Sequence, residues 1–283
     1  MTIAYLDGEY QPLSDVRISP LDRGFLFADG VYEVIPVYGG RLFRADEHLE
    51  RLGRSLAAVR IGDPLDRAGW KALLHGIVER NGGGHQAVYL QVTRGAAPRD
   101  HGFPPDAVPT VFAMSKKMNT DPQTRPLHAV TRPDIRWTRC DIKSVALLPN
   151  VLMRQEAADA GASEAIMVRD GEATEGSATN LFVVTGERLR TPPKSAHILG
   201  GITRDLLIEL VTGADIEVRE EAIPEADLRT AAEIWVTSST KEVAPVVRLD
   251  GEAVAEGEPG PLWQRVNGLF QDYKQRLVRG EVD

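Results

Sequence analysis

A polar run with two prolines divides the chain into stretches with different patterns. It covers residues 116–126, Lys-Lys-Met-Asn-Thr-Asp-Pro-Gln-Thr-Arg-Pro. Such a composition is typical of an exposed linker between domains. The chain has 283 residues, enough for one large domain or two modest ones. We therefore expect a small domain over residues 1–118, a linker over 119–126 and a larger domain over 127–283.

The stretch before the linker alternates strand and helix signals. Asp7-Gly8 predicts a hairpin turn, and the Val-, Ile- and Tyr-rich run 31–38 predicts a strand. Leucines then repeat at helical spacing over residues 49–59, and Asp46 is the expected N-cap of that helix. A second helix is expected around 70–78, with short buried strands at 88–92 and 111–114. This pattern predicts a small α/β domain.

The stretch after the linker contains many short strand patterns separated by turn signals. Residues 165–168 and 181–184 are predicted strands on either side of the Asp170-Gly171 turn. Helical stretches are expected after Pro149, Thr203 and Pro224. This part is therefore predicted to be an α+β domain with a substantial sheet.

Composition excludes several classes of function. The net charge is −8 and no run of Lys or Arg exceeds two residues, so no nucleic-acid partner is expected. The N-terminus lacks a secretory signal, and no apolar run is long enough to span a membrane. One cysteine, Cys140, excludes an internal disulfide and fits a reducing compartment. The six histidines lack metal-ligand spacing, so we expect a soluble cytoplasmic protein without a metal site.

Two residues suggest chemistry of their own. Lys143 lies in Arg-Cys-Asp-Ile-Lys-Ser next to apolar residues, so we expect it to point from a strand into a partly dry environment, which lowers a lysine pKa. Glu175 follows in Thr-Glu-Gly-Ser-Ala-Thr-Asn. A lysine can form a Schiff base with an aldehyde cofactor, and a glutamate can keep a pyridine nitrogen protonated. Taken alone, Lys143 is better explained as an exposed surface lysine, and a solvated turn glutamate explains Glu175 equally well.

Two segments have the composition of anion sites. Gly200-Gly201-Ile202-Thr203 precedes a helical run, and Thr237-Ser238-Ser239-Thr240 follows a predicted strand. Free backbone N–H groups and hydroxyls at such positions bind phosphate, although a helix cap or an ordinary turn has the same composition.

Arginines provide further candidates for anion binding. Arg51 lies off the leucine stripe of the first helix, where it could hold a phosphate or pair with the nearby Glu47 and Glu50. Arg99 and His101 stand two apart in a loop rich in Gly and Pro, and could bind a substrate carboxylate or remain solvated.

The chain resembles the fold-type IV pyridoxal-phosphate enzymes over nearly its whole length. Asp-Arg-Gly-Phe-Leu-Phe-Ala-Asp-Gly-Val-Tyr-Glu at 22–33 is similar to their opening signature. Five further motifs follow in the family's order: His48-Leu49-Glu50-Arg51-Leu52, the Lys143 run, Glu175 to Asn180, Gly201-Ile202-Thr203-Arg204 and Thr237 to Lys241.

This resemblance implies pyridoxal 5′-phosphate as cofactor and a two-domain fold, with a small N-terminal α/β domain and a larger, pseudo-barrel-like C-terminal domain. Lys143 would bond to the cofactor, and Glu175 would be the partner of its pyridine nitrogen. The other cofactor-binding residues would be Arg51, Ile202, Thr203, Ser238 and Ser239, with Arg51, Thr203 and Ser239 holding the phosphate.

Within the family, the chain is most similar to D-amino-acid transaminases. Arg99 and His101 match their carboxylate-binding loop, which acts with a tyrosine, here Tyr32. The resemblance implies transfer of an amino group from a D-amino acid such as D-alanine to a 2-oxo acid such as 2-oxoglutarate, giving pyruvate and D-glutamate. It also implies a homodimer, because the family's loop can be delivered to the partner subunit's site.

Three alternatives remain at this point. The lipophilic Val34-Ile35-Pro36 resembles pocket residues of some branched-chain L-amino-acid and (R)-amine transaminases. A pyridoxal-phosphate lyase acting on aminodeoxychorismate would share the cofactor residues and release pyruvate. From another class, the chain could be a binding protein without catalysis.

Overall fold

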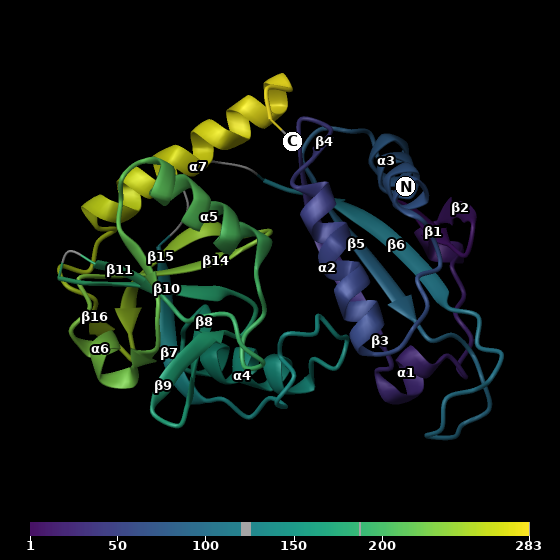
Figure 1. Cartoon of the computed structure of the whole chain (residues 1–283), viewed down its shortest axis with the longest axis horizontal. Coiled ribbons are helices and arrows are strands. Elements are labelled where there is room, and N and C mark those ends of the chain that lie inside the picture. Colours follow the sequence, from purple (N-terminus) through teal and green to yellow (C-terminus); the bar gives the residue numbers. More distant parts are fainter. Residues whose placement is uncertain (120–125, 187, 283) are drawn as a thin grey trace. The chain divides into compact units, whose positions relative to one another are not determined.

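The described chain forms two compact units (Figure 1). A computed structural model describes residues 1–119, 126–186 and 188–282. Unit 1 contains the described residues up to 119, together with Ile142–Ala146 and residues from 276 onward. Unit 2 contains the remaining described residues. Most of the expected linker, residues 120–125, lies outside the described residues, so the domain boundaries stay a prediction.

Unit 1 is built on an antiparallel sheet. Its described strands are β1 (Ile3–Leu6), β2 (Glu9–Pro12), β3 (Gly30–Tyr38), β4 (Arg41–Leu42), β5 (Gln86–Thr93) and β6 (Thr110–Lys117), in the order β2-β1-β6-β5-β3-β4. The short helices are η1 (Leu13–Asp15) and α1 (Arg23–Phe27), and the longer ones are α2 (Ala45–Ala58) and α3 (Arg67–Arg80). The hairpin, strands and helices expected from the sequence in this part are confirmed.

One face of this sheet carries the core of unit 1 (Figure 1). Val31, Ile35 and Val37 alternate along β3 and are buried under both long helices. The leucine stripe of α2 and the apolar residues of α3 join the same cluster. Burial of this many aliphatic side chains, at about 1.5–3 kcal/mol each, holds the helices on the sheet.

The expected N-cap of α2 was wrong by two residues. Helix α2 begins at Ala45, and its N-cap is Arg44, whose φ of 50° is left-handed and whose side chain makes no capping hydrogen bond. Asp46 lies in the first turn, where its charge favours the helix dipole. It pairs instead with Arg67 and Lys71 of α3.

Unit 2 is built on a larger mixed sheet. Its described strands are β7 (Leu127–Pro133), β8 (Glu164–Arg169), β9 (Glu172–Gly176), β10 (Asn180–Thr185), β11 (Arg188–Thr191), β12 (Val218–Glu220), β13 (Ile223–Pro224), β14 (Glu233–Ser238), β15 (Glu242–Leu249) and β16 (Glu252–Ala253). The order is β12-β11-β10-β14-β15-β7-β8-β9-β13, with β16 beside β15. Pairs β7–β8, β7–β15 and β11–β12 are parallel, and the other pairs are antiparallel.

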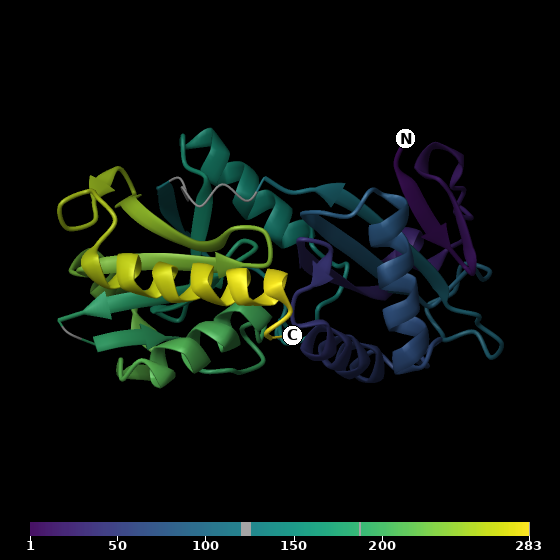
Figure 2. The same cartoon turned by 90° about the horizontal axis from the view of Figure 1, so that it is seen from above.

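Within the described residues of unit 2, three helices connect strands of this sheet and a fourth follows its last strand. They are α4 (Leu148–Asp159), α5 (Ile202–Gly213), α6 (Glu225–Arg229) and α7 (Pro261–Arg279). Helix α4 links the parallel strands β7 and β8, and buries Met153 and Ala157 against them. Figure 2 shows α7 in yellow; near its start, the Trp263 ring donates a hydrogen bond to the Val243 carbonyl of β15 at 3.1 Å. None of the helices in the described ranges has the length and apolar character needed to cross a membrane.

Candidate functional site

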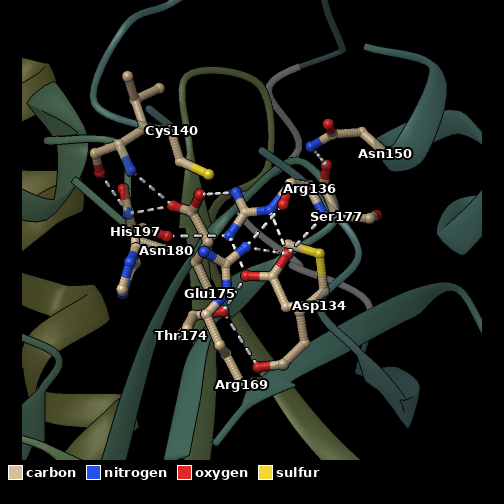
Figure 3. Close-up of polar contacts among 12 residues, drawn as sticks. Asp134, Arg136, Cys140, Asn150, Arg169, Thr174, Glu175, Ser177, Asn180 and His197 are labelled. Carbon is tan, nitrogen blue, oxygen red and sulfur yellow. Dashed lines mark hydrogen bonds and ion pairs between the residues drawn. The ribbon is translucent and has the colours of Figure 1, made fainter. Parts of the chain in front are cut away.

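Glu175 is a buried carboxylate near the end of β9 (Figure 3). Its Oε2 accepts hydrogen bonds from the Leu199 amide at 3.0 Å and from Asn180 Nδ2 at 3.1 Å. Its Oε1 accepts from the Arg136 guanidinium. Three donors from three separate segments therefore fix the position of this carboxylate.

Arg136 is held in turn by Asp134 (Figure 3). The guanidinium donates to both Asp134 oxygens, at 2.9 and 2.8 Å, and its side chain is 5% exposed. The Asp134 side chain has no exposed surface and also pairs with Arg169 at 3.2 Å. Arg136 and Asp134 were not among the expected site residues, because Arg136 and Glu175 are 39 residues apart and no sequence pattern joins them.

The pKa values of Glu175 and Asp134 shift in opposite directions. Burial raises the pKa of Glu175 to about 7, although Arg136 beside it acts in the lowering direction. Burial also acts to raise the pKa of Asp134, but the hydrogen bonds and charge of Arg136 outweigh it and lower that pKa. Glu175 is thus a carboxyl group with a strongly raised pKa, and such perturbed groups are concentrated at functional sites.

Four of the expected cofactor-binding residues lie on two neighbouring segments of unit 2. Ile202 and Thr203 open α5 and are buried. Ser238 ends β14 and Ser239 follows it in the turn to β15, and both are half-buried.

Asn180 connects these segments to Glu175. Its Nδ2 also donates to the Leu199 carbonyl at 2.7 Å, and a β-carbon on Gly201 would collide with its Oδ1. In the register of β10 with β14, Asn180 is paired with Thr237. The fold therefore brings Glu175, the start of α5 and the Ser238–Ser239 turn together around one asparagine.

The donors of this cluster fit pyridoxal 5′-phosphate. Thr237 Oγ1 is buried and has no hydrogen-bond partner among the described residues. The hydroxyls of Thr203 and Ser239 and the first N–H groups of α5 are donors of the kind that bind phosphate. Glu175 supplies a buried acceptor suited to a pyridine N–H. The residues present in unit 2 thus suit both the ring nitrogen and the phosphate of that cofactor.

Lys143 belongs to unit 1 and does not lie on a strand, contrary to the expectation. Its segment runs beside β3 through one isolated bridge, between Val31 and Ser144. The Lys143 carbonyl accepts from the Tyr32 amide at 2.9 Å, and its Nζ lies 4.2 Å from the centre of the Tyr32 ring. Two of the expected site residues, Lys143 and Tyr32, are therefore in direct contact.

Arg51 is buried against β3 and pairs with a residue that the sequence analysis did not propose. Its Nε and Nη2 donate to the two oxygens of Glu33, each at 2.8 Å, and His48 Nδ1 lies 2.7 Å from the same carboxylate. Of the two acidic neighbours expected as alternative partners of Arg51, Glu50 pairs with Arg54 and Glu47 with Arg44.

The position of Glu33 carried a usable signal. Glu33 shares the inward face of β3 with Val31 and Ile35, and a charge on an apolar face requires a partner. Burial acts to raise the pKa of Glu33, but Arg51 and His48 outweigh it and lower that pKa. Burial lowers the pKa of His48. The Glu33–Arg51 ion pair is therefore the main electrostatic interaction of this cluster.

Glu33→Gln is expected to destabilise the protein by about 3–5 kcal/mol, because a buried ion pair loses one partner. The pKa of Glu33 in the folded protein is lowered from its ordinary value of 4.5, so the ion pair stabilises the fold fully at pH values above 4.5. This stabilisation is lost as the pH falls through the folded-state pKa. Urea unfolding monitored by circular dichroism measures the loss. Glu50→Gln, at an exposed pair with Arg54, is the control and should cost less than about 0.5 kcal/mol. Equal losses for the two variants would contradict the prediction.

Arg99 and His101 are brought together on the ring of Phe27. The Arg99 guanidinium lies 5.2 Å and the His101 ring 5.3 Å from the centre of that ring. Arg23 anchors the loop by donating to the Asp100 carbonyl at 2.5 Å. Both side chains belong to exposed residues, so they are accessible to a ligand or to another chain.

Comparisons with known proteins identify the family of the chain. A family model described as amino-transferase class IV matches residues 30–249. A D-alanine aminotransferase of Bacillus licheniformis is 39% identical over 270 residues, which cover 94% of this chain and 95% of the relative.

Two solved structures resemble the fold. One is a branched-chain aminotransferase from Thermoproteus uzoniensis with norvaline, with a TM-score of 0.90 and 23% identity over 100% of this chain and 97% of that one. The other is a hypothetical aminotransferase from Mycobacterium tuberculosis in its PLP-bound form, with a TM-score of 0.85 and 23% identity over 99% and 100%. At these identities the likeness concerns the fold alone, and it confirms the expected fold class. The chain therefore belongs to the amino-transferase class IV family and is an aminotransferase.

Proposed function

We propose that the chain is a pyridoxal 5′-phosphate-dependent D-amino-acid transaminase. It transfers the amino group of a D-amino acid such as D-alanine to a 2-oxo acid such as 2-oxoglutarate, giving pyruvate and D-glutamate. The observation that carries this proposal is the 39% identity, over nearly the full length of both chains, with a protein named D-alanine aminotransferase. The branched-chain relatives among the solved structures are only 23–24% identical and support the fold alone.

The chemistry needs a group that moves a proton and a group that holds one. When bound, pyridoxal 5′-phosphate supplies an aldehyde that accepts the amino group and a ring that delocalises the electrons released at the substrate α-carbon. Lys143 Nζ takes the proton from that α-carbon and later returns a proton in the reverse half-reaction. The Glu175 carboxylate accepts a hydrogen bond from the pyridine N–H and keeps that nitrogen protonated.

The phosphate would be held by hydroxyls, backbone N–H groups and an arginine. Thr203 and Ser239 supply hydroxyls, and Ile202 and Ser238 lie on the same two segments. Arg51 would add a guanidinium, which its two hydrogen bonds to Glu33 hold in place. These roles are supported by the buried donors around Asn180 and by the buried position of Arg51.

Arg99 and His101, with Tyr32, would bind the substrate carboxylate. The exposure of the Arg99–His101 loop supports delivery of these side chains to the partner subunit's site, in a homodimer. We also propose cytoplasmic location and a division into domains at 1–118 and 127–283, joined by a linker at 119–126.

Four amines added separately to the holoenzyme test the subclass. We expect D-alanine and D-glutamate to bleach the visible cofactor band at least about 100-fold faster than L-leucine or (R)-1-phenylethylamine, since a site built for one carboxylate position rejects the wrong enantiomer. Stopped-flow absorbance gives the rates.

The other outcomes would favour the alternative functions. Faster bleaching by L-leucine would favour a branched-chain transaminase, and faster bleaching by (R)-1-phenylethylamine would favour an (R)-amine transaminase. Release of pyruvate from aminodeoxychorismate without an acceptor would indicate the lyase, and no bleaching by any compound a binding protein.

A variant of the proposed carboxylate-binding loop refines this test. Arg99→Ala should raise KM for D-alanine and leave the slow reaction of (R)-1-phenylethylamine unchanged, because that amine has no carboxylate. Arg54→Ala, at an exposed pair on α2, is the control.

A further inference from the structure

Glu164, at the start of β8, is a fully buried carboxylate directed at the turn that follows Glu175. Its Oε1 accepts from the Ser177 amide at 3.0 Å and from the Ser177 hydroxyl, and its Oε2 accepts from Thr179 Oγ1 at 3.3 Å. A β-carbon on Gly176 would collide with Thr179 Oγ1, so the turn is folded tightly against the carboxylate. The proposed function assigns no role to Glu164.

The cation that pairs with Glu164 is Lys241, which follows the Ser238–Ser239 turn. Lys241 Nζ lies 2.8 Å from Glu164 Oε2, and its side chain is 31% exposed. The Lys241 amide donates to Ser238 Oγ at 3.1 Å, which closes the turn that contains Ser238 and Ser239. Lys241 therefore belongs by its backbone to the proposed phosphate turn and by its side chain to the turn after Glu175.

The strand register explains how one lysine reaches both turns. Asn180 and Thr237 are paired between β10 and β14, so the turn before β10 and the turn after β14 lie at the same end of the sheet. Glu164, on β8, contacts both. A carboxylate with no exposed surface is costly unless a cation and hydrogen bonds compensate it, and Lys241 supplies that charge.

We propose that Lys241 is a positioning residue which, through Glu164, holds the turn after Glu175 and the Ser238–Ser239 turn in a fixed relation. It thereby couples the part of the site that takes the pyridine nitrogen to the part that takes the phosphate. This inference rests on the proposed function, because it assumes that both turns bind the same cofactor.

Substitution of Lys241 and substitution of Glu164 should have different effects on the site. Lys241→Met leaves Glu164 charged, buried and without its cation, which should loosen the Ser177 turn. Glu164→Gln removes the charge and keeps an oxygen that accepts from Ser177. The double variant, Glu164→Gln with Lys241→Met, has no buried charge to compensate and should recover much of what Lys241→Met loses.

Cofactor affinity of the apoenzyme, measured by quenching of tryptophan fluorescence with pyridoxal 5′-phosphate, tests this coupling. We expect Lys241→Met to weaken binding about tenfold, Lys241→Arg to stay near wild type and the double variant to return to within about threefold. Arg190→Met, which removes from β11 a cation paired at 2.6 Å with Asp227 of α6, is the control and should not change the affinity. A pH titration of the visible band in each holoenzyme should show a shifted midpoint for Lys241→Met alone, because that band reports the surroundings of the bound cofactor rather than stability.

The outcomes separate this inference from the proposed function. Wild-type protein that does not bind pyridoxal 5′-phosphate contradicts the proposed function itself. Wild-type binding with an unchanged Lys241→Met affinity overturns only the coupling. A double variant as weak as Lys241→Met also overturns it, since Lys241 would then act without Glu164. If Lys241→Met does not fold, the cofactor affinities of Glu164→Gln and of the double variant are each compared with wild type. A tenfold loss of affinity in the double variant, but not in Glu164→Gln, contradicts the proposal.

Discussion

Lys143→Ala is expected to lower kcat by at least about 10⁴-fold, because it removes the amine that we propose moves the substrate proton. The alanine variant should keep the fold of the wild-type protein. Lys143 is tied to β3 through its carbonyl, which accepts from the Tyr32 amide at 2.9 Å, and to α2 through its amide, which donates to Ser55 Oγ at 3.3 Å. Both bonds involve the main chain of Lys143 and remain possible in the alanine variant.

Transamination of D-alanine with 2-oxoglutarate, followed as pyruvate formed, measures the loss. Lys71→Ala is the matched control, since Lys71 lies on the surface of the same unit and pairs with Asp46. Near-UV circular dichroism checks that both variants fold. Multiple turnovers by the Lys143→Ala variant at a rate near that of the control would show that another residue carries the proton.

Periodicity predicted the framework of unit 1 because it reflects local burial. The alternation along β3 and the leucine stripe of α2 each place one face of an element in the core, and the structure has them at nearly the expected residues. The start of α2 was missed because Arg44 adopts a left-handed conformation, which a side-chain pattern does not report.

The site was predictable only in part, since its contacts join distant segments. Glu175 and Lys143 stand in recognisable motifs, but the Arg136–Asp134 pair that holds Glu175 depends on how β7 and β9 come together in space. Glu33 is the exception. Its place between Val31 and Ile35 shows from the sequence alone that a buried charge needs a partner, although not which one.

Glu175→Gln is expected to leave the cofactor bound and to lower kcat by about 10²–10³-fold, since a neutral amide cannot keep the pyridine nitrogen protonated. The surroundings make the change more severe than isosteric replacement suggests. Leu199, Asn180 and Arg136 all donate to the Glu175 carboxylate, whereas the glutamine amide offers one acceptor oxygen and places an NH₂ group against a donor.

The pH dependence provides an independent check of the same residue. Burial raises the pKa of Glu175 to about 7 from an ordinary value of 4.5, so the folded apoprotein binds this proton more tightly than the unfolded chain. The stability that it contributes is fully present below pH 4.5 and is lost as pH rises through about 7. Glu175→Gln removes this titration, and the midpoint of thermal unfolding of the apoprotein should then vary less between pH 5 and 8 than in wild type.

Cofactor binding should show the reverse trend, because the ionised carboxylate is the form that accepts from a protonated pyridine nitrogen. We expect the affinity of wild-type apoenzyme for pyridoxal 5′-phosphate to rise as Glu175 ionises around pH 7, and the Glu175→Gln variant to lack this rise. Glu172→Gln, at an exposed position of the same strand β9, should behave like wild type in every measurement. A Glu175→Gln variant with unchanged kcat, or with the wild-type rise in affinity, would show that the carboxylate buried by Arg136 is structural and that the pyridine nitrogen has another partner.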